Sequence, residues 1–274
     1  MAIAPNTVPS SREVLQTCSH WQVPDSTRAE RIIGRLYGAV PILFLLLTTP
    51  FVNGSMLRMA AIAAVMFGWT QIVGPCGVAH VGGLTPLWHG ASRRTWLKAV
   101  ISYTVAGVMS ASLVGGFFGV VGQILPRSGS LLDPIVLGTF CLVLLFREAG
   151  ILRIPLPEMR RQTRWKWFPK LPAHANSTMW GFDVGLGFVT WISFSGIWLV
   201  MLVAIGSGNP VYGALVFCLY WLGRAAPHWI DPIIMCDPGK TPVYMDVVRS
   251  QFARMRVVHM LTLGWVIVSL VALL

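Results

Sequence analysis

Residues 56–78 read MLRMAAIAAVMFGWTQIVGPCGV, an apolar stretch that ends in Gly74-Pro75-Cys76-Gly77. The stretch has about the 17–25 residues that an α-helix needs to cross a bilayer. Glycine and proline interrupt the helix near its end, and irregular backbone at membrane depth is tolerated only where protein or a water-filled cavity surrounds it. The stretch therefore predicts a membrane helix that is broken beside a thiol. Cys76 is the first candidate for chemistry or binding.

The composition of the whole chain also indicates a membrane protein. Apolar residues make up 55% of the chain and charged residues only 11%, whereas a soluble domain carries about 25% charged residues. Too few charges are present to cover a water-exposed surface. We expect an all-α fold, a polytopic bundle of membrane helices. The seven predicted spans are residues 36–52, 56–78, 99–125, 131–152, 179–205, 211–234 and 257–274.

The distribution of basic residues predicts the orientation of the bundle. Cytoplasmic loops collect Lys and Arg, and here the segment before the first span and every second connection after it are basic. The opposite connections hold only Arg58 and Arg127. We expect a cytoplasmic amino terminus and a carboxyl terminus on the outer side. This bias, together with attraction to anionic lipid, accounts for the net charge of +11 without any nucleic acid.

The chain divides into three parts along this pattern. Residues 1–35 form a polar cytoplasmic tail, residues 36–55 an extra membrane anchor, and residues 56–274 the main membrane domain. Within the main domain, the last three spans echo the three before them, and Phe194-Ser195-Gly196 stands where Pro75-Cys76-Gly77 stands in the first copy. Because each copy has an odd number of helices, the second copy is expected to be inverted in the membrane.

The main domain resembles the CcdA/DsbD family of membrane domains, which move reducing equivalents across bacterial membranes. The family pattern is a Pro-Cys in the first core helix, then a loop and an Arg-led second helix with aromatic, small and glycine residues. The residues that carry the resemblance are Pro75-Cys76, the run SRRTWLKA at 92–99, Tyr103-Thr104-Val105-Ala106-Gly107, the glycine-rich segment 115–122 and the run LGRAAP at 222–227. The resemblance implies a bacterial inner-membrane location, which makes the outer side the periplasm.

The chain departs from that family at the second Pro-Cys, which is replaced by Phe194-Ser195. Exchange between a dithiol and a disulfide needs a second sulfur to resolve the mixed disulfide, so the usual intramembrane couple is absent. In this respect the chain resembles the divergent methylamine-utilisation branch of the family, the MauF proteins. That resemblance implies a role in maturation of periplasmic methylamine dehydrogenase, whose small subunit carries many disulfides and a quinone made from tryptophans.

Five cysteines are present, and no two are spaced as a CxxC, so neither a redox dipeptide motif nor a zinc ribbon is indicated. Cys18 and Cys236 fall in segments predicted to be cytoplasmic, and Cys141 and Cys218 fit the small, buried, apolar role of most free cysteines. Cys76 differs because it stands among Gly74, Pro75 and Gly77, which interrupt the helix and leave backbone groups beside the thiol without helical hydrogen bonds.

Three further polar groups are candidates for a site. His80 follows Cys76 by four residues, so a continuing helix places both on one face. His80 is a modulator of the thiol, a ligand with Cys76 for a soft metal, or a polar group satisfied by a backbone carbonyl. Asp183 is the one acid picked out within a span, with Arg147 and Arg224 as candidate partners. His228 and Asp231 lie near Cys236 but match no fixed metal signature, and a helix-end role is favoured for them.

The favoured function is an accessory membrane protein for maturation of a periplasmic redox enzyme by thiol/disulfide or electron transfer. The expected partners are a periplasmic thiol/disulfide protein or dehydrogenase subunit, other maturation membrane proteins and the lipid bilayer. No cofactor or metal is expected, and one thiol without a resolving partner does not make a stand-alone enzyme. The alternatives are a transporter or binding protein for a small solute or soft metal ion, and a non-catalytic scaffold.

Overall fold

A computed structural model describes residues 26–52, 55–88, 92–126, 128–155, 157, 171–187, 190–234 and 241–274. All regular elements in these ranges are helices, as the composition predicts. Cys18, Cys236, Arg127 and the basic segment 158–170 lie outside the described residues. The helices are α2 (Ser26–Thr48), α3 (Met56–Thr70), α4 (Pro75–Pro86), α5 (Arg93–Ile124), α6 (Pro134–Glu148), α7 (Ala173–Gly185), α8 (Gly196–Ser207), α9 (Pro210–Ile234), α10 (Thr241–Ser250) and α11 (Phe252–Val271).

Four segments of the described chain are long and apolar enough to cross a membrane: Ile32–Phe51, Met56–Val73, Arg93–Ile124 and Phe252–Val271. They coincide with the first, second, third and seventh predicted spans. The other three spans are not confirmed. The fourth is a 15-residue helix, α6. The fifth is split into α7 and α8, of 13 and 12 residues, and the sixth, α9, is a 25-residue helix that carries Arg224.

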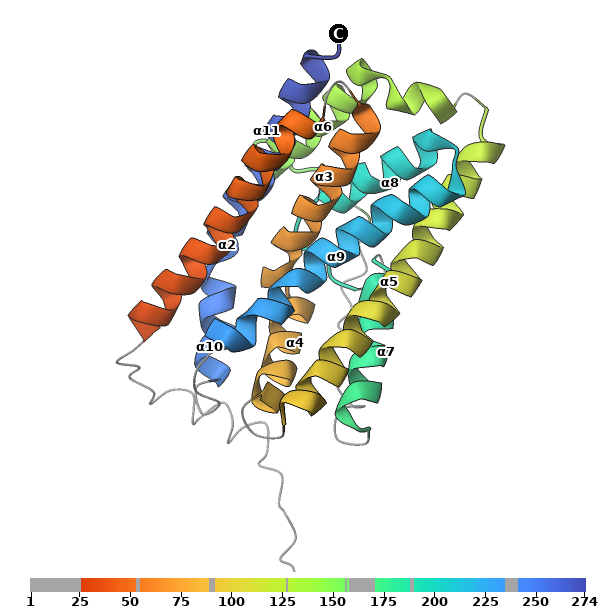
Figure 1. Ribbon diagram of the computed structural model, residues 1–274. Coiled ribbons are helices and arrows are strands. Elements are labelled where there is room, and N and C mark those ends of the chain that lie inside the picture. Colours follow the sequence, from red (N-terminus) through yellow and green to blue (C-terminus); the bar gives the residue numbers. More distant parts are fainter. Residues whose placement is uncertain are drawn as a thin grey trace, which may run out of the picture.

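Helix α5 packs against both α7 and α9, and it runs along the right side of the bundle in Figure 1. Helix α3 packs against α9, α6 against α11, and α2 flanks α10 and α11. Glycines allow the closest approaches, in the way small residues do in membrane helices. A Cβ at Gly115 would overlap the backbone of Gly213, and a Cβ at Gly107 would overlap the ring of Trp221. The glycine-rich face of residues 99–125 is therefore buried against neighbouring helices.

The opposite face of α5 is apolar and points away from the protein. Met109, Leu113 and Phe117 follow one another at intervals of four residues and are 60%, 67% and 62% exposed. Spacing of this kind places them on a single stripe of the helix. Soluble monomers rarely expose large contiguous apolar patches, so this stripe fits contact with lipid chains.

Figure 1 shows which helix ends lie together at each end of the bundle. Helix α4 ends, and α5 and α7 begin, at the lower end in Figure 1, where α2 also begins. The carboxyl terminus lies at the opposite end. Arg93 and Arg94, at the start of α5, thus share an end with the start of α2, as expected from the alternation of basic connections.

Candidate functional site

The helix is interrupted at Gly74. A short 3₁₀ turn, η3 (Gln71–Val73), continues α3, and Gly74 then takes an extended conformation, with ψ of 159°. Pro75 opens α4, the position where a missing N–H and a fixed φ cost the helix nothing. A Cβ at Gly77 would overlap the carbonyl oxygen of Ile72, and one at Gly74 would overlap the Ser193 hydroxyl. The local backbone therefore requires glycine at position 77, and the Ser193 side chain leaves no room for a Cβ at position 74.

A second interruption lies between α7 and α8, and Gln71 joins it to the first. The Gln71 side-chain nitrogen donates to the Phe194 carbonyl at 3.0 Å, and its oxygen accepts from the Ser193 N–H at 2.9 Å. Gln71 itself is fully buried. The two helix breaks, more than a hundred residues apart in the chain, therefore lie side by side and share one amide side chain.

Side chains from two other helices hold the start of α8. The N–H of Ser195 donates to Glu148 Oε1 at 3.0 Å, and the N–H of Gly196 donates to His259 Nε2 at 3.1 Å. Because Nε2 accepts, Nδ1 of His259 carries the proton and donates to the Thr70 hydroxyl at 3.1 Å. These contacts satisfy N–H groups that a helix start leaves unpaired. Polar side chains of neighbouring helices therefore hold the second break in place through hydrogen bonds.

Replacement of Gln71 by methionine is expected to destabilise the contact between the two helix breaks. Methionine has a similar length but leaves the Phe194 carbonyl and the Ser193 N–H unpaired, and each orphaned buried group costs about 1–3 kcal/mol. We expect a lower thermal midpoint in detergent and faster hydrogen exchange across residues 190–196. Gln123→Met, at an exposed position of α5, is the matched control. Equal midpoints and equal exchange in the two variants would contradict this assignment.

Cys76 and His80 lie on the face of α4 that packs into the bundle, and each is 2% exposed. The His80 ring stacks on Tyr103, with centroids 3.9 Å apart and an angle of 25°. It also meets His228 edge-on at 4.9 Å and Trp180 at 5.5 Å. Cys76 packs into the same buried cluster as Tyr103 and Trp180. The structure thus gathers Cys76 and His80 around Tyr103 of α5.

The other cysteines within the described chain do not form a couple with Cys76. Cys76, Cys141 and Cys218 are all free thiols. Cys141 is fully buried among apolar side chains of α6 and its neighbours, which fits its interpretation as a small apolar group. No disulfide joins any of the cysteines within the described residues.

The buried acid that the sequence interpretation missed is Glu148. Its carboxylate is 5% exposed, accepts from the Ser195 N–H and pairs with Arg147 at 2.8 Å. Arg147, one of the candidate partners of Asp183, pairs with its own neighbour in the chain. Asp183 lies half-buried on α7. The sequence did contain a signal for this pair. Arg147 and Glu148 are adjacent inside the predicted fourth span, and charges in a span are usually paired.

Arg224 is the second charge that the structure places in the interior. It is 2% exposed and lies close enough to Tyr103, Tyr220 and His228 to interact with them electrostatically. No group of three or more His, Cys, Asp or Glu residues that could hold a metal ion occurs within the described ranges. His228 therefore belongs to the aromatic and cationic cluster around Tyr103, while Cys236 lies outside the described residues.

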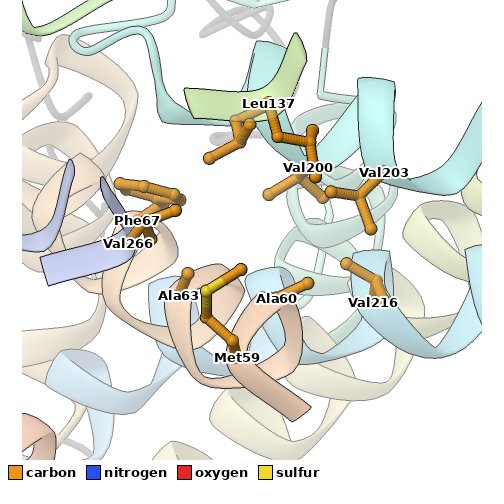
Figure 2. A pocket seen from close by; sticks show the side chains of 10 residues that line it. Met59, Ala60, Ala63, Phe67, Leu137, Val200, Val203, Val216 and Val266 are labelled. Carbon is orange, nitrogen blue, oxygen red and sulfur yellow. The ribbon is translucent and has the colours of Figure 1, made fainter. Parts of the chain in front are cut away.

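Two internal spaces differ in size and chemistry. Figure 2 shows a void of about 10 Å³ with apolar walls, among them Met59, Phe67, Leu137 and Val200. A space of this size is at the lower limit for one water, and its apolar walls offer no hydrogen bond. A second cavity, of about 200 Å³, lies against His80 and the first turns of α7. Of these two spaces, the second is the larger and has polar side chains in its wall, among them Asn176 and Ser177.

These features define a helical protein with four membrane-length apolar segments and two helix breaks that meet in its interior. The chain is similar to the methylamine utilization protein MauF of Paracoccus denitrificans, with 26% identity over 177 residues, and to that of Paracoccus versutus, with 25% identity over 180 residues. The MauF protein of Methylorubrum extorquens is 24% identical over 187 residues.

The matched region covers 64–65% of this chain and 64–65% of the length of each of these relatives. No family model matches the chain. No solved structure matches it either.

Proposed function

We propose that this chain is an integral membrane accessory protein of methylamine utilisation, required for maturation of a periplasmic redox enzyme. The similarity to MauF proteins over about two thirds of the chain supports the methylamine assignment. The four membrane-length apolar segments support the membrane setting. The redox enzyme in this proposal is periplasmic methylamine dehydrogenase, whose small subunit carries many disulfides.

The single observation that carries a thiol role is the position of Cys76. It is a free cysteine at an interrupted helix, packed beside Tyr103 and one turn before His80. In the proposed step, the Cys76 thiolate attacks a disulfide of a partner protein and forms a mixed disulfide, and the other partner sulfur leaves as a thiolate. A thiolate of a second, dithiol-bearing protein then attacks the Cys76 sulfur and releases the partner as a thiolate, and its other thiolate closes a disulfide and releases Cys76. The partner disulfide is thereby reduced and the dithiol protein is oxidised. Cys76 is therefore half of an intermolecular couple.

Trapping of that mixed disulfide tests the proposal. Cells grown on another nitrogen source are transferred to methylamine, quenched in acid and alkylated, and the protein is followed on non-reducing gels. We expect a higher-mass, reductant-sensitive species that is missing from Cys76→Ser and present in Cys141→Ser. A species that persists in Cys76→Ser, or none in the wild-type protein, would contradict a thiol role for Cys76.

The two helix breaks support a CcdA/DsbD-like inverted repeat. In this proposal α3–α4, α5 and α6 form the first copy, and α7–α8, α9 and α10–α11 the second. Gly68 of α3 lies against the backbone of α9, and Gly185 of α7 lies against the backbone of α5. Each broken span thus packs through a glycine on the second helix of the other copy, as a twofold relation requires. Helix α2 is the additional anchor in this scheme.

We also propose an inner-membrane location with the amino terminus in the cytoplasm and the carboxyl terminus in the periplasm. The positive-inside bias supports this orientation, because the ends of the bundle are sorted as the basic connections predict. A carboxyl-terminal alkaline phosphatase fusion, which is active only outside the cytoplasm, should be fully active. An inactive but stably expressed fusion would reverse the orientation.

A further inference from the structure

The outward side of α5 carries two positive charges near its lower end in Figure 1. Arg94 and Lys98 are both exposed and stand four residues apart, so they share one side of the helix. Ile101, Val105 and Met109 follow on the same side at intervals of three and four residues, and they are 43%, 52% and 60% exposed. We call these five residues the α5 stripe. They form one continuous surface that is cationic at one end and apolar beyond it.

Aromatic residues mark the depth of the cationic end. The Arg93 guanidinium lies over the ring of Trp88 at 5.2 Å, and Trp88 meets the ring of Trp96 edge-on at 4.6 Å. Tryptophan gathers at membrane interfaces, where its ring lies at the level of the lipid headgroups. Long basic side chains near a helix end extend toward the same level. The charges of Arg94 and Lys98 therefore lie at headgroup depth, and the apolar part of the α5 stripe extends into the hydrocarbon.

Helices α3, α4 and α5 supply no acid to these two cations. No Asp or Glu occurs in the chain between Glu30 and Asp133, a stretch that includes all three helices. Like charges at positions i and i+4 of a helix repel each other. An anion from outside the chain that lies between Arg94 and Lys98 removes this repulsion.

The acid of α7 lies deeper in the bundle than the two cations. Asp183 is the only acid of this helix, and it follows Gly181, which lies against the backbone of Tyr103. Because α5 and α7 both begin at the lower end, Asp183 is about two turns further into the bundle than Lys98. Helix α8, which also packs on α5, contains no acid.

The acid near the end of α9 belongs to another side of that helix. Asp231 comes two residues after Trp229, and positions two apart do not share a helix face. The Trp229 ring meets that of Trp96, which is on the buried side of α5. Within the described residues, the ion pair found joins Arg147 to Glu148 and involves neither cation of the α5 stripe.

The length of the apolar part matches one leaflet of a bilayer. From Lys98 to Met109 the helix rises about 16 Å. The hydrocarbon core of a bilayer is about 30 Å thick, so one leaflet accounts for about half of that. A soluble anion would leave the apolar part of the α5 stripe uncovered, and a purely apolar molecule would leave the two charges unpaired. A molecule with an anionic head and a long apolar chain covers both parts.

We propose that the α5 stripe binds an anionic phospholipid, with the phosphate between Arg94 and Lys98 and one acyl chain along Ile101, Val105 and Met109. The negative headgroup complements the two charges, and the chain covers the apolar residues beyond them. The site does not involve Cys76 and stands whether or not Cys76 exchanges disulfides. It rests on the membrane setting alone.

The test compares phosphatidylglycerol with phosphatidylcholine of the same acyl chains. The full-length protein is placed in nanodiscs that contain both lipids, and the lipids it retains are counted by native mass spectrometry. We expect one phosphatidylglycerol to be retained in preference to phosphatidylcholine, and the unfolding midpoint to rise with the phosphatidylglycerol fraction. Equal retention of the two lipids would overturn the proposal. Glycerol 3-phosphate, which has the charge without the chains, should leave the midpoint unchanged, and an equal rise with it would exclude a lipid as the occupant.

Variants of the two cations localise the lipid. Arg94→Gln/Lys98→Gln is expected to weaken the preference for phosphatidylglycerol about thirtyfold, and Lys98→Gln alone about fivefold. Both side chains are exposed, so the variants should unfold at the wild-type midpoint in pure phosphatidylcholine.

Arg153→Gln/Arg249→Gln is the matched control, because it removes two exposed arginines from other segments and changes the net charge equally. We expect it to retain phosphatidylglycerol as the wild type does. An equal loss in this control would mean attraction by the overall charge rather than a site. An unchanged preference in Arg94→Gln/Lys98→Gln would place the lipid elsewhere. Either result would contradict the proposal.

Discussion

Replacement of Cys76 by serine is expected to abolish growth on methylamine while leaving the protein in the membrane. Serine is close in size, so the buried cluster around Tyr103 and Trp180 keeps its packing. A hydroxyl does not form a disulfide, so exchange through residue 76 stops completely. The measurements are growth with methylamine as the sole nitrogen source, dehydrogenase activity in the periplasmic fraction, and the amount of the protein in membranes.

Cys141→Ser is the control that separates thiol chemistry from packing. Cys141 is as buried as Cys76 and belongs to the same cluster of apolar side chains. Both substitutions bury a hydroxyl in place of a thiol, so a purely structural effect should appear in both variants. We expect normal growth with Cys141→Ser. Full dehydrogenase activity in Cys76→Ser would remove the thiol from the mechanism.

Replacement of Gly68 by alanine is expected to prevent assembly of a stable bundle. A Cβ at this position would occupy the place of the Tyr220 carbonyl oxygen and would also press on the Arg224 N–H. Both obstacles are backbone atoms of α9, which cannot turn away as a side chain can. Helices α3 and α9 would have to separate, and overpacking of this kind costs about 1–3 kcal/mol or more. The measurements are the yield of monodisperse protein in detergent and its thermal midpoint.

Gly264→Ala is the matched control for this substitution. Gly264 lies within α11, and a Cβ there would meet no atom within 4 Å. Alanine is favoured over glycine in a helix by about 1 kcal/mol, so the control should be neutral or slightly stabilising. If Gly68→Ala were as stable as Gly264→Ala, the close approach of α3 and α9 would be wrong.

Local features of the chain were predictable because they depend on neighbouring residues. Long apolar stretches predict membrane-length helices, and four of the seven expected spans were found as such. The residue before a proline is disfavoured in the helical conformation, so the interruption at Gly74-Pro75 could be predicted from the local sequence. A proline alone does not break a helix, because Pro41 lies inside α2 and Pro227 lies inside α9. The three spans that were not confirmed are a short helix, a split helix and a helix with a buried arginine.

The amino-acid sequence by itself thus determined the helical, membrane-like character of this protein, the position of the first break and the choice of Cys76 and His80. Only the tertiary structure decided which side chains contact these groups. Gln71 bridges two breaks, Glu148 closes the second, and the rings of Tyr103 and His228 pack on His80. The physical reason is that such contacts join helices distant in the chain. They depend on how glycine-lined faces pack together, which hydropathy and local spacing do not encode.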